Sequence, residues 1–145
     1  CMYIYKTKIF YTRFKVKEII KVDSPQTVAG VFRKELIGPI EKFACLFLNV
    51  RNNIIEKYIF SILETGTTDQ CAVYVKNIIK IALLVHADRI ILSHNHPSGF
   101  PSPSLSDDQV TKTLKDAAKL MNIDLVDHLI VTEDSFYSYN DNNRI

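Results

Sequence analysis

The chain has 145 residues, 47% of them hydrophobic, and its 18 basic and 16 acidic residues leave a formal charge of +2. This length fits one domain with a buried core, and the composition is that of a globular chain rather than a disordered one. The charge is too small to indicate a nucleic-acid partner by itself. No apolar run approaches the ~20 residues of a membrane span and the charged start lacks a signal-peptide pattern, so we expect a cytoplasmic protein with no membrane partner.

The first 22 residues differ in charge from the rest of the chain. Residues 1–22 carry six basic residues against Glu18, interleaved with aromatic side chains. Two strand-like segments, 2–10 and 15–22, lie in this leader. Basic and aromatic residues together can bind a nucleic-acid backbone, but we favour a leading strand or hairpin with a solvated basic face.

Start and stop signals then predict a helix and a hairpin. Ser24 at the N-cap, with Pro25 at the first helical position, predicts a helix that ends before Gly38-Pro39. Two apolar runs on either side of a short polar turn predict the hairpin. It comprises a strand over 42–50, a turn over 51–53 and a strand over 54–62.

The second half alternates helices and strands. A mostly apolar helix over 72–86 should be largely buried, and the polar tail 140–144 should fray. The other elements are a buried strand from Arg89, an amphipathic helix that ends at Asn122, and strands over 124–131 and 135–139. Hairpins mixed with single helices predict an α+β domain over residues 1–145, with a mixed β-sheet and flanking helices.

Two histidines at the end of a buried strand mark the candidate site. His94 and His96 lie on the same side of an extended backbone, because side chains of a strand alternate faces. A Pro-, Ser- and Gly-rich loop follows, and Asp107 stands in the first turn of the next helix. Two imidazoles and one carboxylate leave a fourth tetrahedral position open, as in catalytic zinc sites. We therefore expect one divalent metal ion, zinc, although these ligand types also suit other metals.

Two other interpretations of the same residues were weighed. Ser104 and Asp107 also form a helix capping box, and capping can coexist with metal binding at a helix start. The contiguous residues His94-Asn95-His96 match the one-letter name of the HNH nucleases. The active site of those nucleases, however, draws its residues from separated positions of a ββα unit. Three cysteines without a CxxC spacing argue against a cysteine-ligated zinc, and the Pro-Cys-x-x-Cys ligand pair of a nucleobase deaminase does not occur in the sequence.

The pattern of these residues is similar to a known signature. His94-x-His96, seven residues, Ser104, two residues and Asp107 resemble the JAMM metalloprotease motif of JAB/MPN domains. The sequence from Ser93 to Gly99, with Asp127-His128 further on, resembles the RadC branch of that superfamily. The resemblance runs from about Gly38 to about Tyr139 and implies α/β/α layers and a zinc-dependent peptidase or isopeptidase.

The general base cannot be chosen from composition, which leaves four glutamates as candidates: Glu35, Glu41, Glu56 and Glu64. The JAMM resemblance implies Glu41, which precedes an apolar strand upstream of the histidines. In the expected mechanism zinc lowers the pKa of a water, Glu41 accepts its proton, and the Ser104 hydroxyl donates a hydrogen bond to the developing oxyanion.

The remaining expectations concern Asp127 and the partners. Asp127 is interpreted either as a group that fixes a ligand histidine through its outer N–H or as a buried carboxylate that holds a turn. A peptide or protein is the expected substrate. DNA is the weaker expectation, because the resemblance to RadC-like proteins, commonly labelled as DNA repair proteins, does not include their N-terminal helix-hairpin-helix-like region. Substrate identity and oligomeric state have no readable signal.

Overall fold

The computed structural model describes residues 18–60 and 70–145. The expected strand over 2–10 and the first three residues of the one over 15–22 lie outside these residues. Within the described part of the leader, Lys21 forms one isolated antiparallel bridge with Asn53.

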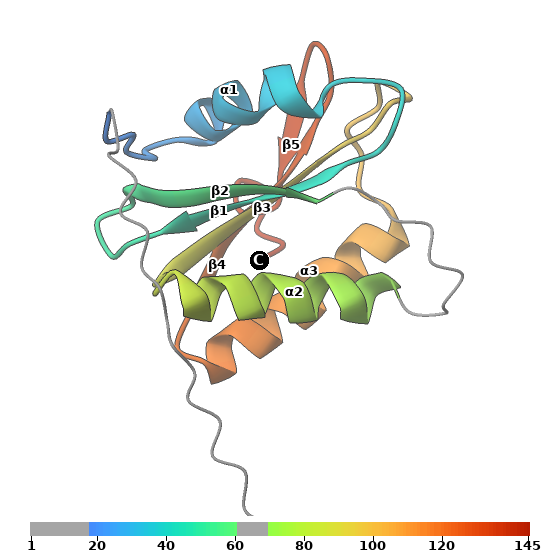
Figure 1. The fold of residues 1–145 in the computed structure, drawn as a ribbon. Coiled ribbons are helices and arrows are strands. Elements are labelled where there is room, and N and C mark those ends of the chain that lie inside the picture. Colours follow the sequence, from blue (N-terminus) through green and yellow to red (C-terminus); the bar gives the residue numbers. More distant parts are fainter. Residues whose placement is uncertain (1–17, 61–69) are drawn as a thin grey trace, which may run out of the picture.

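A five-stranded mixed sheet forms the centre of the molecule (Figure 1). Its strands are β1 (Phe43–Leu48), β2 (Ile54–Phe60), β3 (Arg89–Asn95), β4 (Asp124–Val131) and β5 (Phe136–Ser138). They lie in the order β2-β1-β3-β4-β5, in which β3 and β4 are parallel and the other neighbours antiparallel. The predicted hairpin is the β1–β2 pair, and the predicted strand over 124–131 has the observed bounds.

Three helices cover the two faces of the sheet, as Figure 1 shows. Helix α1 (Pro25–Leu36) packs on one face, and α2 (Gln70–Leu84) and α3 (Leu105–Leu120) pack together on the other. The α+β class with α/β/α layers is thus confirmed. Among the described helices, none is both long and apolar enough to cross a membrane.

Both predicted helix starts have capping geometry. The Ser24 side chain accepts a hydrogen bond from the Thr27 backbone N–H at 3.2 Å, and Pro25 follows at the first position of α1. At the start of α3, the Ser104 hydroxyl accepts from the Asp107 N–H while the Asp107 carboxylate accepts from the Ser104 N–H. Each cap satisfies backbone donors that the helix itself cannot pair.

The sheet separates two apolar cores because its side chains alternate faces. Along β3, Ile90 and Leu92 pack beneath α2 and α3, whereas Ile91 packs beneath α1. All three are essentially excluded from water, so β3 is fixed from both sides. The polar residues at its end are consequently held on a rigid element.

Two expectations about burial and order were wrong. The C-terminal turn of α2 is exposed, with Leu83 at 49% and Leu84 at 56% of full accessibility. The tail after β5 is tied to the domain rather than frayed, because the Asn140 N–H donates to Asp127 and the Arg144 side chain forms an ion pair with Asp108.

Candidate metal centre

The two histidines converge at the end of β3. His94 is fully buried, and its Nε2 lies 2.9 Å from Nε2 of His96, which follows the strand. Phe43 on β1 stacks on the His94 ring with a centroid distance of 4.8 Å. The period-two spacing predicted that both rings would lie on one side, and the structure brings their Nε2 atoms together.

Asp107 completes a three-residue cluster from the first turn of α3. Its Oδ1 lies 3.1 Å from His94 Nε2, and its Oδ2 lies 3.4 Å from His96 Nε2. Ligand atoms of a tetrahedral site with bonds of ~2.0–2.1 Å are about 3.3 Å apart. The three observed separations, 2.9, 3.1 and 3.4 Å, therefore fit one small divalent cation.

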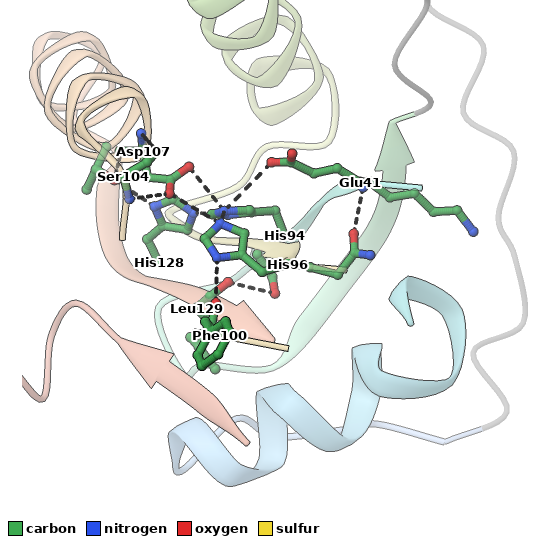
Figure 2. Close-up of polar contacts among 12 residues, drawn as sticks. Glu41, His94, His96, Phe100, Ser104, Asp107, His128 and Leu129 are labelled. Atoms are coloured by element: carbon green, nitrogen blue, oxygen red, sulfur yellow. Dashed lines mark hydrogen bonds and ion pairs between the residues drawn. The ribbon is translucent and has the colours of Figure 1, made fainter. Parts of the chain in front are cut away.

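Glu41 borders this cluster from the segment before β1. Phe43 pairs with His94 in the antiparallel register, and extending that register by two residues places Glu41 opposite His96. Its Oε1 lies 4.0 Å from His94 Nε2, and the side chain is 42% exposed. Figure 2 shows Glu41, His94, His96 and Asp107 pointing toward one another, and one ligand atom from each lies within 4.8 Å of the others.

The other candidate bases do not join this group in the described part of the chain. Glu35 forms an ion pair with Lys57, and the Glu56 carboxylate accepts the Lys57 N–H on β2. Glu64 lies outside the described residues. Glu41 also stands farther from His94 than Asp107 does, a position suited to a base that contacts a molecule held at the cluster.

Hydrogen bonds and a neighbouring charge keep Asp107 in its ionised form against the effect of burial. Burial by itself raises the pKa of this carboxyl, but the hydrogen bond and charge of His94 when that ring is protonated, followed by the Ser104 bonds, lower it well below the usual range. The Ser104 N–H donates to Oδ2 at 2.7 Å. The capping role of Asp107 is thus compatible with metal binding, because the same carboxylate presents an anionic oxygen to each histidine.

The loop after β3 orients His96. Gly99 has φ of 83°, a conformation that glycine adopts without strain, and its N–H donates to the His96 carbonyl at 3.1 Å. The turn brings the Phe100 carbonyl to 2.9 Å from His96 Nδ1. Because a carbonyl oxygen only accepts, Nδ1 carries a proton, and in the neutral ring the Nε2 lone pair then faces Asp107.

His94 has a different outer partner, which sequence reasoning missed. His94 Nδ1 lies 2.8 Å from Nε2 of His128 on β4, and His128 Nδ1 lies 2.6 Å from the Thr111 hydroxyl on α3. Burial, and then the nearby His94, lower the pKa of His128 well below its usual value, so the ring is neutral. Alternation along β4 places His128 and Asp127 on opposite faces of the sheet, but it does not indicate which face holds the site.

Asp127 does not fix a ligand histidine, because it points to the opposite face of the sheet. Its neighbour Leu129 packs beneath α1, and side chains two apart share a face. The Asp127 carboxylate accepts from the His128 and Asn140 N–H groups and from the Ser138 hydroxyl. It holds the turn after β5, which was the alternative interpretation.

This arrangement defines a class of protein: a JAB-type domain with a His-x-His, Asp and Glu cluster at the end of a buried strand. The model of the RadC-like JAB domain matches residues 22–144, and the chain belongs to that family. It is 40% identical over 126 residues to a UPF0758 protein of Paraburkholderia phytofirmans, covering 86% of this chain and 48% of that protein. A UPF0758 protein of Haemophilus influenzae strain PittEE is 43% identical over 122 residues, covering 83% and 54%. The chain thus spans about half the length of these relatives.

Proposed function

We propose that the protein is a zinc-dependent hydrolase that cleaves an amide bond in a peptide or protein, as a peptidase or isopeptidase. One observation carries this proposal: two imidazole Nε2 atoms and an ionised carboxylate converge at tetrahedral spacing, with a second carboxylate, that of Glu41, beside them. A structural zinc site has four protein ligands at bonding distance, whereas here Glu41 stands back from the other three.

The metal is proposed to be held by His94, His96 and Asp107. A zinc ion bound there supplies Lewis acidity, lowering the pKa of a coordinated water and polarising a carbonyl oxygen. Glu41 is partly exposed, so its carboxylate can contact both solvent and a substrate. It accepts the proton of the attacking water and returns it to the departing amine, which leaves as a neutral group.

Ser104 is proposed to stabilise the oxyanion of the tetrahedral intermediate. Its hydroxyl oxygen accepts the Asp107 N–H at 3.1 Å, which fixes the oxygen at the edge of the site. That bond uses an oxygen lone pair and leaves the hydroxyl hydrogen free to donate. A donor held in place before the reaction stabilises developing charge without reorganisation.

Elemental analysis of the purified protein tests the metal site first. We expect about one zinc per chain, lost in a His96→Ala, Asp107→Ala double variant that retains its circular dichroism spectrum. No binding by the wild-type protein, even after zinc is added, would contradict the proposal.

The hydrolytic role is tested separately with a library of peptide and isopeptide substrates. We expect cleavage by the zinc-loaded wild type and loss of at least ~100-fold in Glu41→Gln, which keeps the shape of the base but cannot accept a proton. Glu56→Gln on β2 is the matched control. If the zinc-loaded wild type and zinc-loaded Glu41→Gln cleaved the substrates at the same residual rate, the site would not be hydrolytic.

A further inference from the structure

A chain of buried hydrogen bonds runs from the backbone of α3 to the outer nitrogen of His94. The Thr111 hydroxyl donates to the Asp107 carbonyl oxygen at 2.7 Å and lies 2.6 Å from His128 Nδ1. His128 Nε2 lies 2.8 Å from His94 Nδ1. The chain therefore begins and ends at residues of the metal cluster, since Asp107 contributes its carbonyl and His94 its imidazole.

The first bond sets the direction of every proton along this chain. A carbonyl oxygen only accepts, so the single hydroxyl hydrogen of Thr111 points to Asp107, and Thr111 must accept from His128 Nδ1–H. With its proton on Nδ1, the His128 ring has a lone pair on Nε2, which accepts from His94 Nδ1–H. His94 Nε2 is consequently left as a lone pair directed into the cluster.

The reversed arrangement of protons is incompatible with metal binding. If Thr111 donated to His128 Nδ1, His128 would carry its proton on Nε2 and donate it to His94 Nδ1. His94 would then be protonated on Nε2, the atom that lies 3.1 Å from Asp107 Oδ1 and faces the cation position. Both arrangements contain the same number of protons, so Thr111 selects between tautomers without changing any charge.

Packing keeps the relay in register. His128 is fully buried and stacks on Tyr139 with a centroid distance of 4.9 Å and an interplanar angle of 11°. The Tyr139 hydroxyl in turn donates to Asp108 at 2.8 Å, next to the cluster residue Asp107. The ring of His128 thus cannot turn away from His94 without disturbing the start of α3.

We propose that Thr111 and His128 form a positioning relay that holds His94 in its metal-binding tautomer, with the proton on Nδ1. Neither residue contacts the cation position, so both act through His94. The inference rests on the proposed metal site but not on hydrolysis. It assigns the second residue of the Asp127-His128 pair a role at the site, while Asp127 serves the opposite face of the sheet.

Zinc affinity of four variants tests the relay, measured by competition with a chromophoric chelator. Thr111→Val removes the hydroxyl two rings away from the metal, and Thr111→Ser retains it. His128→Phe removes the acceptor but keeps the stack on Tyr139, whereas the amide oxygen of His128→Gln can replace Nε2. We expect Val and Phe to weaken zinc binding by ~10–100-fold, and Ser and Gln to stay close to the wild type.

Nitrogen-15 spectra of the imidazoles give a readout that general loss of packing does not move. In the zinc-loaded wild type we expect Nδ1–H on both His94 and His128, and in metal-free Thr111→Val a shift of His94 toward Nε2–H. Two results would overturn the relay while leaving the metal site in place. One is a zinc affinity of Thr111→Val and His128→Phe equal to that of the wild type, and the other is a proton on His128 Nε2 in the zinc-loaded protein.

The same experiments separate the relay from the proposed function. Should the apolar variants not fold, the wild-type spectrum decides, because the two tautomers are mutually exclusive. A wild-type protein that binds no zinc would instead refute the metal site and, with it, the relay. Zinc bound through the expected tautomers without any hydrolysis would leave the relay standing and refute the hydrolase.

Discussion

Asn95 holds the backbone on both sides of Glu41. The Lys42 N–H donates to the Asn95 side-chain oxygen at 2.6 Å, and the Asn95 amide donates to the Ile40 carbonyl at 3.0 Å. Asn95 stands between the two histidines of the cluster and is 1% exposed. One residue thus connects the end of β3 to the segment that carries the proposed base.

Removal of this amide is expected to loosen Glu41 but not the metal site. Asn95→Ala leaves the Lys42 N–H and the Ile40 carbonyl without their partner, which should lower the free energy of unfolding by ~1–3 kcal/mol. Urea denaturation of the metal-free protein measures this loss. Asn95→Asp, which keeps the acceptor for Lys42, should lose less. Zinc affinity should be nearly unchanged in both, and a large fall in Asn95→Asp would show that the amide supports the histidines instead.

Asp127 is expected to matter for stability rather than for zinc. Asp127→Ala removes the acceptor of three hydrogen bonds, from His128, Ser138 and Asn140. Since each buried donor left unpaired costs about 1–3 kcal/mol, a loss of at least ~2 kcal/mol in the free energy of unfolding should follow. Chelator competition should give zinc affinity close to that of the wild type. A fall comparable to that of His128→Phe would mean that Asp127 positions a ligand after all.

The titration of Asp127 should have a distinct sign. Burial raises the pKa of this carboxyl above its ordinary value, although hydrogen bonds from Ser138, Asn140 and His128 partly oppose the shift. An acid whose pKa is higher in the folded state binds its proton more tightly there, so protonation stabilises the fold. That contribution is complete below the unfolded-state pKa of ~3.9 and is lost as the pH rises through the folded-state pKa.

The comparison with Asp127→Asn isolates this contribution, because asparagine does not titrate. The free energy of unfolding of the metal-free wild type, minus that of the variant, should increase as the pH falls from about 7 to about 4. The same substitution at exposed Asp124 is the control and should give a flatter difference. A difference that decreased toward acid would mean that the pKa of Asp127 is lowered by folding.

The fold was predictable where local chemistry decides it. Ser24 and Ser104 cap the starts of α1 and α3 as expected, and continuous apolar runs give the buried strands β1 and β3. The pairing of His94 with His96 follows from backbone geometry alone. The link from Thr111 to His128 joins α3 to β4, and no spacing in the sequence encodes that distance.

The wrong expectations also concern contacts between elements that lie far apart in the sequence. Period-two alternation allows only one of Asp127 and His128 to face the cluster, but which one depends on the side of the sheet that α3 covers. Leu83 is exposed although its helical spacing is that of a core residue, since no described element covers that end of α2. The tail was expected to fray because its partner Asp108 lies far away in the sequence.

The loop glycine should support His96 through its backbone conformation. Gly99→Ala meets no atom within 4 Å of the added Cβ, so its whole cost is the strain of φ at 83°, about 1–2 kcal/mol. Relief of that strain would move the Phe100 carbonyl away from His96 Nδ1 and free the ring to change tautomer. We therefore expect weaker zinc binding in Gly99→Ala, with Gly38→Ala as the control, because Gly38 also has open space around it but no positive φ. Equal zinc affinity in the two variants, measured beside their thermal unfolding, would show that the carbonyl does not orient His96.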